Sequence, residues 1–100
     1  MVKHIIIWQL KEELSADEKA QIKLEIKERL EALVGVIDGL AELKVITDVM
    51  DSSNGDLLLD CTLENESALS FYAEHPAHVE VKDSIIMPNV SSRVCIDYII

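Results

Sequence analysis

The chain has 100 residues, a length that suits one domain with a single hydrophobic core. Hydrophobic side chains make up 49% of it, more than a small monomer easily buries, so the composition favours an oligomer. Nineteen acidic against nine basic side chains give a formal net charge of −10, which argues against binding to nucleic-acid phosphates and to anionic membrane surfaces.

The first predicted element is a strand over residues 4–10, because this run is rich in β-branched and aromatic side chains. Both of its faces are apolar, with Ile5 and Ile7 on one and Ile6, Trp8 and Leu10 on the other. Such a strand needs a cover on each side. Helices can supply one cover, and the sheet of a second copy of the chain can supply the other.

A helix is predicted to start at Ser15-Ala16-Asp17-Glu18, because Ser15 and Glu18 have the spacing of a capping box. Apolar side chains then recur at helical spacing, at Ile22, Ile26, Leu30 and Leu33. Gly35 and Gly39 indicate where the helix stops and the chain turns into the next strand.

Two strands joined by a turn follow, over residues 40–50 and 56–64. The first has its apolar face at Leu43, Val45 and Val49, and the second at Leu57, Leu59, Cys61 and Leu63. The turn between them contains Asn54-Gly55, a strong signal for a tight hairpin. The opposite face of the second strand is mixed in polarity, and it could meet either solvent or a polar-lined cavity.

A second helix is predicted from Asn65, and Pro76 interrupts it because proline lacks the amide donor and clashes with the preceding turn. A further helical piece resumes through Val79, Val81, Ile85 and Ile86 and ends near Pro88, before a last strand over residues 93–100. The order βαββαβ predicts an α+β, ferredoxin-like fold: a four-stranded antiparallel sheet with helices on one face, in a single domain over residues 1–100. Two such sheets packed face to face would form a dimeric α/β barrel.

Cys61 and Cys95 both lie in apolar strand-like runs and lack the spacing of a zinc site or a disulfide framework. We therefore expect two buried free thiols. The N-terminus lacks the features of a signal peptide, and no stretch approaches the roughly 20 apolar residues that span a bilayer. These observations predict a cytoplasmic protein.

The chain resembles the stress-responsive dimeric α/β-barrel (Dabb) family from Met1-Val2-Lys3-His4-Ile5 through to Val94-Cys95-Ile96-Asp97-Tyr98. The most specific element is Tyr72-Ala73-Glu74-His75-Pro76-Ala77-His78-Val79, which matches the family's Y-x-x-H-P-x-H-x signature. This resemblance implies a ferredoxin-like homodimer joined through its sheet faces. It implies function less narrowly, because most members have no assigned reaction, whereas one plant member is a polyketide cyclase that performs an aldol condensation without a metal or an organic cofactor.

In that cyclase the tyrosine and the second histidine of the signature are catalytic, which implies catalytic roles for Tyr72 and His78. His78 could remove a proton α to a carbonyl, and the Tyr72 phenol could stabilise the resulting enolate. Each residue also has a structural interpretation. His78 could bond a backbone carbonyl at a helix end, and Tyr72 could lie at a rim with its ring buried and its hydroxyl in water.

The substrate pocket is predicted to include His4, Ile6, Trp8 and His75. The first three share a strand face, which we expect to point into the space between the two sheets of the dimer. His75 is expected to shape the backbone together with Pro76 and to be more exposed than His78. The chain has one Trp, one Phe and two Tyr, so its pocket would be aliphatic, unlike the aromatic cavity of the cyclase.

Two functions follow as hypotheses. One is a dimeric protein that binds a small apolar or carbonyl-containing molecule near Tyr72 and His78. The other is a cofactor-independent, polyketide-cyclase-like acid/base enzyme. No cofactor or metal is expected, because His75-x-x-His78 with Asp60 and Glu64 does not supply a firm coordination set.

Overall fold

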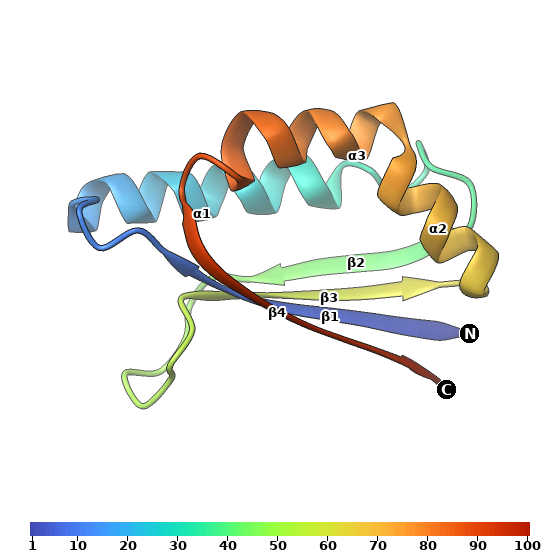
Figure 1. Cartoon of the computed structure of the whole chain (residues 1–100), viewed down its shortest axis with the longest axis horizontal. Coiled ribbons are helices and arrows are strands. Elements are labelled where there is room, and N and C mark those ends of the chain that lie inside the picture. The colour runs from blue at the N-terminus through green and yellow to red at the C-terminus, as the bar shows by residue number, and fades with distance from the viewer.

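The computed structural model describes residues 1–100 and has one layer of helices on one face of a four-stranded sheet (Figure 1). Its elements, in chain order, are β1 (Val2–Leu10), α1 (Ala16–Glu31), β2 (Leu40–Ile46), β3 (Leu57–Leu63), α2 (Glu66–Glu74), α3 (Pro76–Val81), the π-helical turn η1 (Lys82–Ile86) and β4 (Val90–Ile99). All strand pairs are antiparallel, in the order β2-β3-β1-β4. The predicted ferredoxin-like α+β architecture is therefore confirmed. No helix has both the length and the hydrophobicity to cross a lipid bilayer.

One core of 19 buried side chains fills the space between the helices and the sheet. Strand β3 contributes the face predicted from its alternation: Leu57, Leu59, Cys61 and Leu63. Strand β1 contributes its even-numbered side chains, and its odd-numbered ones point away from the helices. The burial pattern thus decides which of the two apolar faces of β1 belongs to the core of the single chain.

Helix α1 begins with the predicted capping box. The Glu18 N–H donates to Ser15 Oγ at 3.1 Å, and the Ser15 N–H donates to Glu18 Oε1 at 3.0 Å. The helix buries Ile26 and Leu30 and ends at Glu31, so the buried Leu33 belongs to the turn that follows. The periodic apolar side chains therefore form the core face of α1 and continue beyond its end.

Two glycines in this turn allow a matched stability test. Gly35 and Gly39 have φ values of +88° and +86°, where an L-residue is disfavoured by roughly 1–2 kcal/mol. A Cβ at Gly39 would also lie 2.7 Å from the Cβ of Ala68, whereas one at Gly35 would meet nothing within 4 Å. We therefore expect Gly39→Ala to lower the free energy of unfolding by about 1–3 kcal/mol more than Gly35→Ala does, as overpacking predicts. Urea denaturation measures the difference, and equal losses would mean that α2 shifts to accept the methyl group.

The connection between β2 and β3 differs from the predicted tight hairpin. Strand β2 ends at Ile46, and residues 47–56 form a loop that projects on the side away from the helices (Figure 1). The type I′ turn expected for Asn54-Gly55 needs positive φ values, and neither residue has one. Gly55 is instead favoured by close packing, since a Cβ there would lie 2.3 Å from Cγ2 of Ile7.

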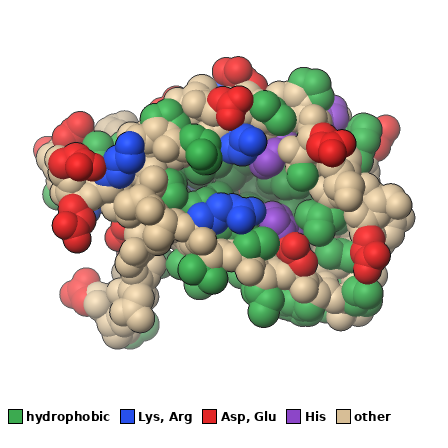
Figure 2. All heavy atoms as spheres, in the orientation of Figure 1, with side chains coloured by type: hydrophobic (Ala, Val, Ile, Leu, Met, Phe, Trp, Pro, Cys, Tyr) green, Lys and Arg blue, Asp and Glu red, His purple; other side chains and the backbone are tan.

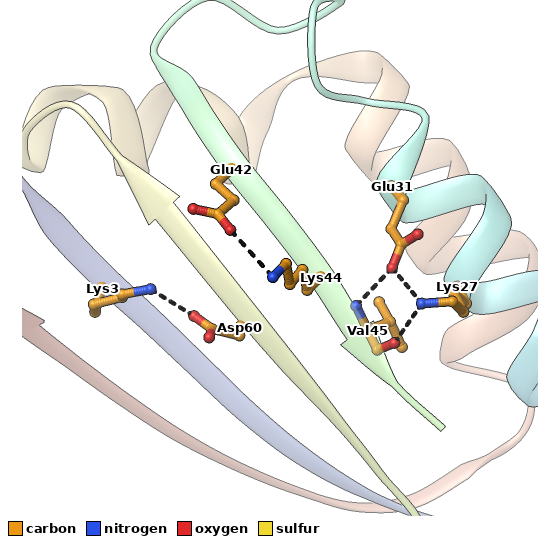
Figure 3. Close-up of polar contacts among 7 residues, drawn as sticks. All are labelled: Lys3, Lys27, Glu31, Glu42, Lys44, Val45 and Asp60. Atoms are coloured by element: carbon orange, nitrogen blue, oxygen red, sulfur yellow. Dashed lines mark hydrogen bonds and ion pairs between the residues drawn. The ribbon is translucent and has the colours of Figure 1, made fainter. Parts of the chain in front are cut away.

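Two side chains of α1 bond the outer edge of β2 (Figure 3). The Glu31 carboxylate accepts the Val45 N–H at 2.9 Å and the Lys27 ammonium at 2.7 Å, and Lys27 also donates to the Val45 carbonyl at 2.9 Å. Burial raises the pKa of Glu31, but these hydrogen bonds outweigh it and leave that pKa lowered. This edge of the sheet is thus occupied at Val45 by side chains of its own chain.

The face of the sheet away from the helices is uncovered. Exposed apolar side chains on it are Ile7, Ile46, Val94, Ile96 and Tyr98. Two ion pairs lie beside them: Lys3 with Asp60 at 2.9 Å and Lys44 with Glu42 at 3.7 Å (Figure 3). Contiguous exposed apolar surface of this kind is typical of an interaction face. We refer to this surface as the open sheet face.

Candidate functional site

A break between α2 and α3 shapes the signature segment. The side chain of Asn65 caps α2 by accepting the Ala68 N–H at 2.8 Å. His75 follows α2 with an extended backbone (ψ 133°), the conformation favoured before proline, and its Nδ1 accepts the Ala77 N–H at 3.0 Å to cap α3. The break at Pro76 confirms the sequence prediction, and it gives His75 a structural role.

The break brings together the two predicted catalytic residues, Tyr72 on α2 and His78 on α3. Their ring centroids lie 4.3 Å apart with the planes tilted by 41°. Tyr72 is only 1% exposed, so the interpretation of a rim residue with its hydroxyl in water is wrong. The hydroxyl is buried and has no hydrogen-bond partner in the chain. Such unpaired buried groups are uncommon, and either an ordered water or a bound molecule can supply the missing partner.

The protonation of this pair follows from burial. Burial, with a smaller contribution from Cys61, raises the pKa of Tyr72, so its phenol stays protonated and can act as a donor. Burial also lowers the pKa of His78, against the effect of its bond to Ala73, so the imidazole is neutral near pH 7. A neutral imidazole beside a protonated phenol is a base beside a hydrogen-bond donor.

The tautomer of His78 follows from its backbone contact. Its Nδ1 lies 3.1 Å from the Ala73 carbonyl oxygen, and because a carbonyl only accepts, Nδ1 must carry the proton. The lone pair of the neutral ring is then on Nε2, which is left available as a proton acceptor. The structural interpretation of His78 as a carbonyl-bonded residue is thus confirmed, and it leaves the basic nitrogen free.

Strand β1 brings His4 to the same place. Its ring centroid lies 6.2 Å from that of Tyr72, and the side chain is buried. His4 Nδ1 hydrogen-bonds Asp97 Oδ1, and Cys95 Sγ lies 3.7 Å from the same nitrogen. Asp97 and Cys95 were not predicted as site residues. Their proximity to His4 comes from the pairing of β1 with β4 across the whole length of the chain, and no local motif indicates it.

The predicted placement of the β1 pocket residues between two sheets is wrong. His4, Ile6 and Trp8 are 7%, 4% and 3% exposed within the single chain, because the helices cover this face of β1. Ile6 and Trp8 are ordinary core residues, and His4 is the polar member of the row. The candidate site therefore lies between the helices and the sheet of one chain.

Two other predictions concern exposure: the burial of the two cysteines, and the exposure of His75 relative to His78. Cys61 is a buried free thiol as expected, and burial raises its pKa to about 12, but Cys95 is exposed because it lies on the edge strand β4, which no helix covers. His75 and His78 are both half-buried. The ring of His75 contacts the exposed Phe71, at a centroid distance of 5.5 Å.

The surface beside the site is hollowed and locally basic. Figure 2 shows the hollow between the helices and the sheet, with histidine and Lys or Arg side chains along its border. Lys82 and Arg93 add positive charge near His78, and neither forms an ion pair with a carboxylate. A groove of about 290 Å³ reaches Asp97 from between α2 and the ends of β1 and β4. The groove therefore opens onto Asp97, the hydrogen-bond partner of His4.

The chain matches a protein family and several solved structures. A family model described as "Stress responsive A/B Barrel Domain" matches residues 2–100. A dimeric Bacteroides fragilis protein of unknown function and ferredoxin-like fold is 29% identical, with a TM-score of 0.93 over 99% of this chain and 95% of its own. A hypothetical Arabidopsis thaliana protein is 27% identical, with a TM-score of 0.74 over 97% of this chain and 85% of its own. A hydroxynitrile lyase from Passiflora edulis, 22% identical with a TM-score of 0.74 over 99% and 92%, shares the fold. A search of curated proteins finds no match.

Proposed function

The chain belongs to the stress-responsive A/B barrel domain (Dabb) family, and from this premise we propose that it binds a small carbonyl compound between its helices and its sheet and acts on it by acid/base catalysis. The observation that carries the proposal is the buried, unpartnered hydroxyl of Tyr72 packed against His78. A carbonyl oxygen is the acceptor that this hydroxyl lacks. The available Nε2 of the neighbouring His78 is a base for the adjacent carbon.

The proposed step is proton abstraction α to the carbonyl. Tyr72 donates a hydrogen bond to the carbonyl oxygen, and His78 Nε2 takes the proton from the α-carbon. The products are an enolate, whose charge lies on the oxygen bonded by Tyr72, and an imidazolium. The raised pKa of Tyr72 keeps the phenol a donor throughout, and His4, hydrogen-bonded to Asp97, lies edge-on to the ring of Tyr72. No cofactor is needed for this proton transfer.

The second candidate function is binding without turnover. A ligand carbonyl or hydroxyl can satisfy Tyr72 with no chemistry at all, and Tyr72 belongs to the same apolar core as Ile6 and Trp8. In this case the purified protein should retain a small molecule, and native mass spectrometry would detect it.

We further propose that two copies pair through the open sheet face. Its exposed apolar side chains support this, as does the dimeric state of the Bacteroides fragilis relative. Both cysteines are free, which suits a reducing compartment such as the cytoplasm. The candidate site lies within one chain, so each copy would carry its own set of Tyr72, His78 and His4.

The acid/base proposal is tested by exchange of α-protons in D₂O, followed by proton NMR on a panel of small ketones and keto acids. We expect His78→Gln, which keeps an amide donor for the Ala73 carbonyl, to lower the exchange rate by about 10²–10⁴-fold. Glu80→Gln is the control, because its side chain is 71% exposed on the same helix. Equal exchange by the wild type and His78→Gln would contradict catalysis, and ligand retention without exchange would favour binding alone.

The lowered pKa of His78 also predicts the pH dependence of stability. Burial is the largest cause of the shift, and it moves the pKa of His78 in the folded chain below 6.5. Between the folded-state pKa and pH 6.5, the unfolded chain therefore binds the proton more readily than the folded chain does. The stability from neutral, buried His78 is therefore complete above pH 6.5 and is lost as the pH falls through the folded-state pKa. Urea denaturation from pH 8 to 5 should give a shallower decline for His78→Gln than for the wild type. Identical pH profiles would mean that His78 titrates as it does in the unfolded chain.

A further inference from the structure

We propose that His4, Cys95 and Asp97 form a binding site for one zinc ion beside the Tyr72–His78 pair. Their potential ligand atoms, Nδ1, Sγ and a carboxylate oxygen, all lie within 4.8 Å of one another. They provide one nitrogen, one sulfur and one oxygen donor, which together form a donor set typical of zinc. This inference goes beyond the acid/base function and does not depend on it.

Two paired strands hold the three residues in place. His4 on β1 lies directly opposite Asp97 on β4, and Cys95 precedes Asp97 by two residues, opposite Ile6. Because side chains alternate along a strand, Cys95 and Asp97 share the face that carries His4. The pairing is regular here, since its only irregularity lies at Gln9 and Leu10. The ligands therefore sit on a rigid framework.

The distances fit tetrahedral coordination with a small adjustment. Zn–S near 2.3 Å and Zn–N or Zn–O near 2.1 Å place the sulfur about 3.6 Å from both other donors. Cys95 Sγ lies 3.7 Å from His4 Nδ1 and 3.6 Å from Asp97 Oδ1. In this geometry the distance between His4 Nδ1 and Asp97 Oδ1 has to increase to about 3.4 Å, which breaks their direct hydrogen bond. The Asp97 side chain is 43% exposed and is free to rotate that far.

The chemistry of the donors selects the ion. A thiolate is a poor ligand for magnesium and calcium, which prefer oxygen, whereas zinc accepts all three donor types. Three protein ligands leave a fourth position open. Tyr72 lies beside the site, because its ring centroid is 6.2 Å from that of His4, and its hydroxyl is buried and unpartnered. A net charge of −10 further favours a cation.

Binding also changes the protons of the site. Zinc displaces the thiol proton of Cys95, which leaves as H⁺, and takes the lone pair of His4 Nδ1, so the imidazole proton moves to Nε2. Because zinc binds the thiolate and releases the thiol proton, zinc affinity should increase with pH. His4 changes from an acceptor at Nε2 to a donor. The ion would therefore alter the hydrogen bonding available beside Tyr72 and His78.

The test uses reduced, chelator-treated full-length protein. It is titrated with Zn²⁺ against a chromophoric competitor, and separately with Co²⁺ while thiolate-to-cobalt absorbance is recorded. We expect one ion per chain and a thiolate band. Cys95→Ser should remove the band and weaken zinc binding at least ten-fold, and Asp97→Asn should weaken it as well. Cys61→Ala, which removes the other thiol, is the matched control and should keep both signals.

Three results would overturn the proposal. One is the absence of a cobalt–thiolate band in the wild type, and another is unchanged zinc affinity in Cys95→Ser. The third is loss of binding in His78→Gln with retention in Cys95→Ser, which would place the ion on His75 and His78. Metal affinity and absorbance are measured without turnover. A negative zinc result therefore does not contradict the acid/base proposal, and absence of α-proton exchange does not contradict the zinc site.

Discussion

Replacing Tyr72 with Phe is expected to abolish most of the proposed α-proton exchange while leaving the fold as stable as before, or more stable. The ring is 1% exposed in the core, and Phe fills the same space. The hydroxyl it removes has no partner in the chain, and an unsatisfied buried polar group costs about 1–3 kcal/mol. The same change removes the donor to the substrate oxygen, which should cost about 10²–10³-fold in α-proton exchange.

Two measurements on one variant check this prediction: urea denaturation and the exchange assay in D₂O. Tyr72→Ala is the contrasting variant, because loss of the whole ring should destabilise by about 3–5 kcal/mol. If Tyr72→Phe instead lowers the free energy of unfolding by 1 kcal/mol or more, the hydroxyl has a structural partner such as an ordered water. Full exchange activity in Tyr72→Phe would remove the phenol from the mechanism.

The second large effect is expected at the open sheet face. Val94 and Ile96 are 63% and 62% exposed in the single chain, so aspartate at both positions should cost an isolated monomer little. In a dimer joined through this face, the same charges would be buried without partners, at a cost of several kcal/mol. We expect Val94→Asp with Ile96→Asp to weaken self-association by at least about 10²-fold.

Analytical ultracentrifugation over a range of concentrations measures this change. Val36→Asp and Met87→Asp are matched controls, because these residues are 58% and 61% exposed outside the sheet, in the turn after α1 and after η1. A wild type that is monomeric at high concentration would refute the proposed pairing. A dimer that survives both aspartates but dissociates in a control variant would move the interface to the helical side.

The position of the candidate site relative to this face has a mechanistic consequence. Tyr72, His78 and His4 meet between the helices and the sheet, whereas the open sheet face lies on the other side of β1. The candidate site and the proposed interface thus use the even and the odd positions of β1, respectively. A variant made monomeric at Val94 and Ile96 should therefore still show the effect of His78→Gln on α-proton exchange.

Much of the fold follows from local sequence signals. The capping box at Ser15 and Glu18, the helix break at Pro76 and the alternating core face of β3 are all predicted correctly, because each depends on residues close together in the chain. The signature that unites Tyr72 and His78 is equally local. The order of elements then determines the ferredoxin-like architecture, because few ways of connecting such elements are available.

The tertiary structure alone decides what surrounds that signature. Both faces of β1 are apolar, so composition does not tell which one the helices cover, and the side predicted for His4 is wrong. Asp97 reaches His4 across 93 residues through strand register, and Cys95 is exposed because β4 is an edge strand. Local patterns determine which elements form, whereas register and edge position depend on packing between distant segments. For this protein the sequence by itself indicates Tyr72 and His78 as candidate site residues, and only the folded chain shows the unpartnered hydroxyl and the His4–Cys95–Asp97 cluster beside them.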